Sequence, residues 1–219
     1  MKVEAVFVRS AASAGDMPRD GLAELALVGR SNVGKSSLIN ALARRRVART
    51  SGAPGKTRLA NLYRVARGSA TPFYLVDLPG FGYARGERQE LEAVTRAYFE
   101  RPALAKATAG LLLVDARHPG LESDVRAWRW LESIVGQAAI VATKIDKLSR
   151  AERLRVTTTN EAVFEHPVLP LSAATGEGLD ELWKLIDRLL NSSNPRPRSS
   201  RLASPTAPEA RRPRRLQRS

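Results

Sequence analysis

The feature that most constrains the fold of this chain is the octapeptide GRSNVGKS at residues 29–36. It follows a mostly apolar run, residues 22–28, and precedes a helical pattern over residues 35–45. The pattern G-x-x-x-x-G-K-[ST] between a strand and a helix is typical of a phosphate-binding loop, because glycines let successive backbone N–H groups point at one anion. An ordinary glycine-rich turn is the alternative, and it would not require both flanking elements. The motif therefore predicts a P-loop.

Each residue type of this loop has a physical role. Lys35 is expected to reach the β- and γ-phosphate oxygens, and Ser36 to ligate Mg²⁺. The expected nucleotide contacts are Gly29, Arg30, Ser31, Asn32, Val33, Gly34, Lys35, Ser36 and Ser37.

Apolar runs alternate with helical patterns along most of the chain, which indicates parallel strands joined by crossover helices. The expected strands are 22–28, 59–65, 73–77, 110–115, 138–143 and 168–171. The expected helices are 35–45, 87–99, 121–135, 150–161 and 179–190. We therefore expect an α/β, three-layer P-loop NTPase fold, with a mostly parallel six-stranded sheet and helices on both faces. Ligands of such sheets bind where the strands end.

Composition divides the chain into a domain and a tail. Residues 1–191 suffice for one α/β domain, whereas residues 192–219 are rich in Arg, Pro and Ser and are expected to be disordered. The last 25 residues hold eight arginines and one acid, and the whole chain has a net charge of +14. Such a charge favours polyanionic partners, first RNA and second an anionic membrane surface.

Other features of the composition exclude several classes of site. The chain has no cysteine, which rules out disulfides and thiolate metal sites, and two histidines argue against a zinc centre. The apolar stretch at residues 3–8 is too short for a secretory signal and contains Glu4. We expect a cytoplasmic protein.

Two further motifs follow expected strands. Asp77, Leu78, Pro79 and Gly80 match D-x-x-G, in which the Asp holds Mg²⁺ through water and the Gly amide senses the γ-phosphate. Thr143, Lys144, Ile145 and Asp146 match N/T-K-x-D. A carboxylate at Asp146 accepts two hydrogen bonds from guanine, while adenine would leave its charge unpaired. Thr143 stands where Asn is commoner, which predicts the loss of an amide that braces the P-loop and a modest affinity.

Two weaker motifs complete the set. Ser172, Ala173 and Ala174 match the last guanine loop, in which the Ala173 N–H would meet the base oxygen. Gly55, Lys56, Thr57, Arg58 and Leu59 lie where a switch loop should place a threonine on Mg²⁺. Thr57 is favoured over Thr50 because it lies next to the strand. The expected metal ligands are thus Ser36, Thr57 and, through water, Asp77.

Residues 5–190 resemble a GTPase of the TrmE–Era–EngA–EngB–Septin class, and within it the EngB/YihA family. The phrases GRSNVGKSSLINAL, TSGAPGKTR, VDLPGFGYA, TKIDKL and LSAATGEGLDEL carry the resemblance. The resemblance implies GTP and GDP as ligands and a role in assembly of the large ribosomal subunit, with its precursor or rRNA as partner. It also implies a role in normal cell division and septation. We expect a monomer.

Hydrolysis is expected to be slow without a partner. Phe81 follows Gly80 at the position where many GTPases place a glutamine that orients water. Arg58 and Arg85 are possible replacements, and Asn32 occupies the position that binds K⁺ in related potassium-stimulated GTPases. Candidates for a catalytic role are Asn32, Lys35, Thr57 and Gly80.

Some alternatives stay open at this level. Trp130 either stacks on an RNA base or packs under a neighbouring loop or the N-terminal segment. Packing is the favoured alternative. Arg44, Arg45 and Arg46 either offset a helix dipole or contact RNA. The leading function is a GTPase switch; the alternatives are a GTP-sensing RNA-binding module with negligible turnover and a division factor at a membrane surface.

Overall fold

Seven strands form one sheet in the residues that the structure, a computed structural model, describes: 2–49, 59–81, 94–101 and 108–193. The strands are β1 (Val3–Ala11), β2 (Glu24–Gly29), β3 (Ala60–Arg67), β4 (Phe73–Asp77), β5 (Thr108–Asp115), β6 (Gln137–Thr143) and β7 (Val168–Pro170). Their order is β1-β3-β4-β2-β5-β6-β7, and among them only β3 runs opposite to the rest. The mostly parallel α/β sheet is as predicted, but it has one strand more than the six expected.

The additional strand is β1, which pairs with β3 at the edge of the sheet. From the sequence alone, residues 3–8 are no more than a poor candidate for a secretory signal. The strand gives little sequence signal because the side chains of Val6, Phe7 and Val8 are all exposed, so the usual alternation of apolar and polar residues is missing. The pairing register also shifts between Phe7 and Arg9.

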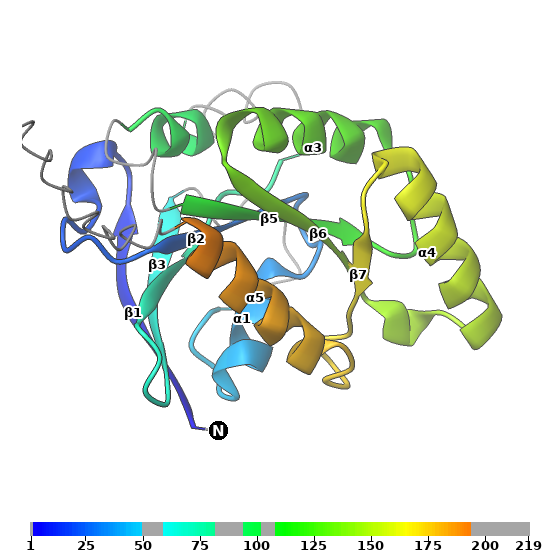
Figure 1. Cartoon of the computed structure of the whole chain (residues 1–219), viewed down its shortest axis with the longest axis horizontal. Helices are drawn as coiled ribbons and strands as arrows, with labels where there is room; N and C mark the ends of the chain where they lie inside the picture. The colour runs from blue at the N-terminus through cyan, green and yellow to red at the C-terminus, as the bar shows by residue number, and fades with distance from the viewer. Residues whose placement is uncertain (1, 50–58, 82–93, 102–107, 194–219) are drawn as a thin grey trace, which may run out of the picture.

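Helices cover both faces of the sheet (Figure 1). They are α1 (Lys35–Ala43), α3 (Glu122–Ile134), α4 (Arg150–Phe164) and α5 (Leu179–Ser193), with short 3-10 helices η1 (Ala14–Asp16) and η3 (Ile145–Lys147). Residues 94–99 are also helical, and the rest of the helix expected over 87–99 lies outside the described residues. Helices α1 and α5 pack on one face, while α3, α4 and residues 94–99 pack on the other. The three-layer arrangement is confirmed.

Strand β2 lies in the middle of this core. All six of its residues are buried, as expected for a parallel strand with helices on both sides. On one face the strand layer meets Leu38 and Leu42 of α1, and on the other it meets Trp128 and Leu131 of α3. The strand that precedes the P-loop is thus packed between helices on both sides.

Helix α1 is shorter than expected because Arg44 takes a left-handed backbone conformation with φ of 51°. The Asn40 side chain then binds the returning chain: its Oδ1 accepts from the N–H groups of Val47 and Ala48, both at 2.8 Å. Arg45 donates to the carbonyl of Ala5 on β1. This cation therefore joins α1 to the edge strand rather than only offsetting a helix dipole.

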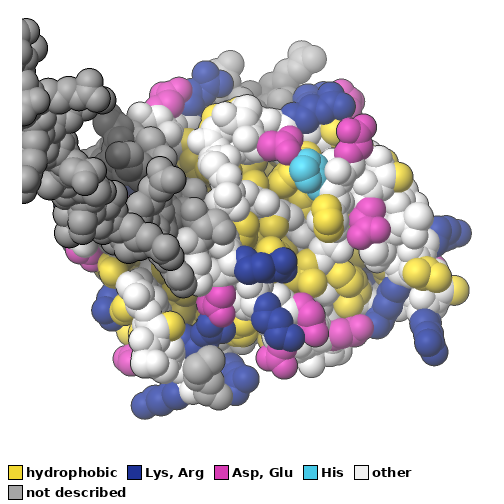
Figure 2. Space-filling model, in the orientation of Figure 1, with side chains coloured by type: hydrophobic (Ala, Val, Ile, Leu, Met, Phe, Trp, Pro, Cys, Tyr) yellow, Lys and Arg dark blue, Asp and Glu magenta, His cyan; other side chains and the backbone are white. Residues whose placement is uncertain are grey.

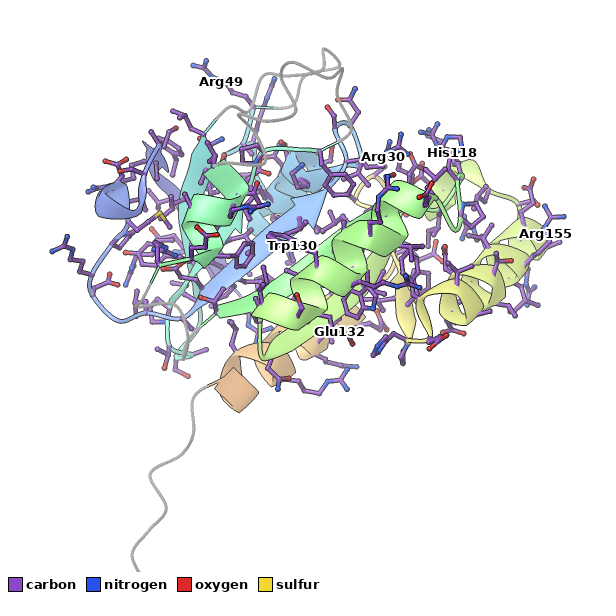
Figure 3. The ribbon with its side chains drawn as sticks, turned by 90° about the horizontal axis from the view of Figure 1, so that it is seen from above. Arg30, Arg49, His118, Trp130, Glu132 and Arg155 are labelled. Atoms are coloured by element: carbon purple, nitrogen blue, oxygen red, sulfur yellow. The ribbon has the colours of Figure 1, made fainter. Side chains whose placement is uncertain are left out.

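Trp130 is half-buried and packs edge-to-face against Phe99, with the ring centroids 5.3 Å apart. It points from α3 towards the helical residues 94–99 (Figure 3). This contact favours the packing hypothesis over the hypothesis that Trp130 is exposed and stacks on RNA. The partner, however, is a helical segment and not a loop or the N-terminal segment.

Candidate nucleotide-binding site

Four of the five motifs meet at the carboxyl edge of the sheet. Gly29 ends β2, Asp77 ends β4, Thr143 ends β6, and Ser172 follows β7. In Figure 3, Arg30 lies beside the N-terminal end of α3 at this edge. The strand order alone places these residues together, because parallel strands end at the same edge.

The P-loop and the D-x-x-G loop are bound to each other by their backbones. Ser31 N–H donates to the Phe81 carbonyl at 3.0 Å, and Phe81 N–H donates to the Gly29 carbonyl at 3.3 Å. A Cβ on Gly80 would lie 2.8 Å from Ser31 N, so only glycine fits there without a backbone shift. Asn32 and Gly34 have positive φ values of 58° and 113°, which curl the loop.

Lys35 is the first residue of α1, and its side chain is buried against the P-loop. Its side-chain Nζ donates to the Gly29 carbonyl at 3.3 Å. Burial lowers the pKa of this ammonium group, and the nearby charge of Asp77 opposes that effect. A cation kept in this position is suited to meet phosphate oxygens.

Asp77 and Ser36 form an oxygen pair that fits a hard divalent cation. Ser36 Oγ lies 3.4 Å from Asp77 Oδ2, and the residue Asp77 is only 2% exposed. Its other oxygen, Oδ1, is buried without a hydrogen-bond partner. Burial raises the pKa of this carboxyl group. An orphaned carboxylate oxygen beside a serine hydroxyl suits Mg²⁺, which binds through a few protein oxygens and retains waters.

The two base-binding motifs are joined through the Asp146 side chain. Ser172 Oγ donates to Asp146 Oδ1 at 2.7 Å, and this hydrogen bond lowers the pKa of the carboxyl group. Thr175 N–H in turn donates to Ser172 Oγ at 3.1 Å. The sequence motif assigned a role only to the backbone N–H of Ala173; the Ser172 hydroxyl, which orients the Asp146 carboxylate, was missed.

Thr143 supplies the brace that was expected to be lost. Its hydroxyl lies 2.6 Å from the Val33 carbonyl of the P-loop and 3.0 Å from the Val114 carbonyl of β5. A hydroxyl can donate to one of these at a time, and the shorter contact is to the P-loop. The missing amide therefore gives no reason to expect a modest affinity.

The remaining predicted residues are placed as follows. Leu78 and Ile145 lie in the core, Ala173 is half-buried, and Ser37, Leu59 and Ala174 are exposed. Gly55, Lys56, Thr57, Arg58 and Arg85 lie outside the described residues.

Comparisons with known proteins show the family of this chain. Residues 24–144 match the family model described as "50S ribosome-binding GTPase". The proteins named "Probable GTP-binding protein EngB" from Heliobacterium modesticaldum and Thermotoga maritima are each 40% identical to the chain. The matches span 89% and 85% of this chain, and 97% and 96% of the relatives. The chain belongs to the EngB family of GTP-binding proteins.

Solved structures show the same fold. A crystal structure of Aquifex aeolicus Era bound to GDP and AlF₄⁻ has a TM-score of 0.67 at 25% identity, covering 77% of this chain and 57% of that one. A probable EngB protein has a TM-score of 0.59 at 20% identity, covering 78% and 99%. Membership of the EngB family makes GTP and GDP ligands of this protein and GTP hydrolysis its activity.

One group at the site was not predicted at all. Asp115 ends β5 and contacts both Lys144 and Arg117, at 2.9 Å and 2.7 Å. An aspartate after an apolar strand resembles any strand-end turn, so no local signal distinguishes it. The expected strands 110–115 and 138–143 both end at this edge, and Asp115 lies next to Thr143 on the neighbouring strand. That placement could have suggested Asp115 as a site residue.

Proposed function

We propose that this EngB protein is a cytoplasmic switch for assembly of the large ribosomal subunit, with slow intrinsic GTP hydrolysis. The observation that carries the nucleotide part is the Asp146 carboxylate, held by Ser172 at 2.7 Å on the same sheet edge as the P-loop. The ribosomal part is supported by the family description and by the net charge of +14. Era has been solved with a segment of 16S ribosomal RNA, which shows that this relative in fold binds rRNA.

Each end of the nucleotide has its own group of residues in this proposal. The backbone N–H groups of residues 30–36 and the Lys35 ammonium group bind the phosphates. Asp146 accepts from the guanine N1–H and 2-amino groups, and the Ala173 N–H donates to the base oxygen. The stem of Lys144 lies along the purine face.

Ser36 and Thr57 of the switch loop would hold Mg²⁺ directly, and Asp77 would hold it through water. Bound there, the ion supplies positive charge that offsets the charge on the phosphates. The unpartnered Oδ1 of Asp77 supports this assignment. The Gly80 amide, next to the P-loop, senses the γ-phosphate.

Catalysis without a glutamine is the least usual part of the proposal. Phe81 has no hydrogen-bonding side chain, and its backbone groups are already bonded to the P-loop. We assign the compensating charge to K⁺ at Asn32, where it would offset charge developing between the β and γ phosphates. Slow turnover that K⁺ stimulates more than Na⁺ is the expected behaviour.

The net positive charge of the chain also indicates which residues bind the ribosomal partner. On the face shown in Figure 2, Lys and Arg side chains alternate with Asp and Glu side chains instead of forming one large patch. We assign much of the attraction for rRNA to the last 25 residues, because they hold eight arginines and one acid. Within the described residues, no helix is both long and apolar enough to span a bilayer.

The test combines binding and turnover with purified large-subunit particles. Binding is measured over a range of salt concentrations in the GDP state and with a GTP analogue, and phosphate release is measured with and without particles. A switch predicts tighter binding in one nucleotide state and multiple turnovers. Equal binding in both states without turnover would favour the GTP-sensing RNA-binding module. We also propose a role in normal cell division and septation, which is tested by filament formation after depletion of the protein in a host.

A further inference from the structure

Asp115 holds two cations from two different loops at the end of β5. The residue is 8% exposed and lies opposite Thr143 in the sheet. The Arg117 guanidinium donates from Nε to Oδ1 at 2.9 Å and from Nη2 to Oδ2 at 2.7 Å. Lys144 Nζ donates to the same Oδ2 at 2.9 Å. The fork-like pairing with Arg117 fixes the plane of the carboxylate.

Lys144 has a second partner, which lies in the P-loop. Its Nζ donates to the Asn32 carbonyl at 2.5 Å, and its backbone is left-handed with φ of 63°. The ammonium group is therefore held between the P-loop and the end of β5. A lysine stem is long and flexible, so without these two partners it would sample several rotamers.

The charges around Asp115 keep it ionised at neutral pH. Burial by itself raises the pKa of this carboxyl group, but hydrogen bonds from Arg117 and Lys144 lower it below its ordinary value. A second buried carboxyl group, Asp124 on α3, interacts electrostatically with Asp115 and with Arg30 of the P-loop. The network thus joins β5, α3, the P-loop and the base-binding loop.

We propose that Asp115 is a positioning residue for guanine-nucleotide recognition: it fixes the Lys144 ammonium group so that the lysine stem is ordered before the base binds. Arg117 acts one step further away, by holding the Asp115 carboxylate. This inference rests on the proposed binding of guanine nucleotides at the site. A residue ordered in advance binds more tightly, because less entropy is lost on binding.

The test is a double-mutant cycle on GDP affinity, measured by isothermal titration. Asp115→Asn keeps the shape and removes the charge, and Lys144→Met keeps the stem and removes the ammonium group. We expect Asp115→Asn to weaken GDP binding about tenfold, the usual size of one charge-assisted hydrogen bond. In the Lys144→Met background the same change should have almost no further effect. A purely structural role would give effects that multiply in the double variant, which would overturn the proposal.

Asp187→Asn is the matched control. It also removes a carboxylate from an arginine, Arg67, but that pair lies at the end of antiparallel β3, away from the site. Its GDP affinity should be unchanged. If Asp115→Asn does not fold, Arg117→Gln tests the same network: a loss of affinity in the wild-type background that vanishes with Lys144→Met supports the proposal, and no loss overturns it. Absence of GDP binding by the wild-type chain would instead refute the proposed function.

Discussion

At the scale of single residues, a close contact between two backbones restricts which residue can occupy position 80. The P-loop passes so near Gly80 that a Cβ there would lie 2.8 Å from Ser31 N and 2.9 Å from Ser31 Cα. Both neighbours are backbone atoms, which cannot move aside as a flexible side chain can. Glycine at this position therefore serves packing between the two loops, in addition to any contact with phosphate.

Gly80→Ala should weaken GDP binding by about tenfold or more, because the P-loop must shift to admit the methyl group. The measurement is GDP affinity by titration, with folding checked by circular dichroism. Gly136→Ala is the control: a Cβ there meets nothing within 4 Å, so the affinity should stay that of the wild-type chain. An unchanged affinity for Gly80→Ala would show that the two loops separate easily.

Single residues also show what the sequence could predict about the site. Asp146 was predicted because its motif carries a specific base-recognition chemistry. Asp115 was not, because its role depends on strand register, which pairs it with Thr143 across 28 residues of chain. At position 143, the comparison with asparagine predicted that the contact with the P-loop would be lost. Only the three-dimensional contact, 2.6 Å to the Val33 carbonyl, shows that a hydroxyl reaches the same loop.

At the scale of elements, a buried ion pair ties the helical residues 94–99 to the start of β2. Glu24 Oε2 accepts from Tyr98 OH at 2.6 Å and from Arg101 Nη2 at 2.7 Å. The Arg101 guanidinium also lies over the Tyr98 ring, 4.5 Å from its centroid. Glu24 begins a strand whose other end is the P-loop, so the helix is anchored far from the phosphates.

Arg101→Met should lower the free energy of unfolding by about 3–5 kcal/mol, because it leaves the buried Glu24 carboxylate without its cation. Chemical denaturation measures the change. Adding Glu24→Gln should restore part of the loss, since the uncompensated charge is then removed. The comparison variant is Arg126→Met, whose exposed pair with Glu122 should contribute less than about 1 kcal/mol. Equal losses for the two arginines would contradict the anchoring role.

Asp124 on helix α3 makes the stability of the fold depend on pH. The residue is 1% exposed, and its Oδ1 has no hydrogen-bond partner. Burial raises its pKa to about 6; Arg30 lowers the value and Asp115 raises it further. The folded chain therefore binds this proton more tightly than the unfolded chain does. The resulting stabilisation is complete below the unfolded pKa of about 4 and is lost as the pH rises through about 6.

Asp124→Asn removes that titration. Relative to the wild-type chain, the free energy of unfolding of the variant should rise by about 2–3 kcal/mol between pH 4 and pH 6, and then stay level. Urea denaturation across this pH range measures the difference. A difference that does not depend on pH would show that Asp124 titrates alike in the folded and unfolded chains.

The strands with both faces buried were predicted, and the one strand that was missed, β1, is mostly exposed. Strand β4 has the predicted bounds, Phe73–Asp77, since all five of its residues are buried between helical layers. Strand β1 has an exposed outer side, and its apolar residues Val6, Phe7 and Val8 do not alternate with polar ones. A strand at an edge is defined by its partner, here β3, and sequence patterns carry little information about partners.

At the scale of the whole molecule, the proposal separates two tasks. The sheet edge binds nucleotide, and the basic residues 195–219, which lie outside the described part of the chain, attract rRNA. Deleting them should leave GDP affinity intact, lower the affinity for large-subunit particles and flatten its salt dependence. Each rRNA phosphate that the tail neutralises should add roughly 0.7–0.9 to the slope of log affinity against log salt concentration. An unchanged slope would show that the tail does not bind the particle.

The most direct test of the central claim is the base preference of Asp146→Asn, measured by titration with GDP and with xanthosine diphosphate. Asp146 is held by Ser172 and should accept two hydrogen bonds from guanine. An asparagine amide can donate to the 2-oxo group of xanthine instead. We predict that the wild-type chain prefers GDP and that the variant prefers xanthosine diphosphate, each by at least about tenfold. An unchanged preference for guanine in the variant would contradict the account.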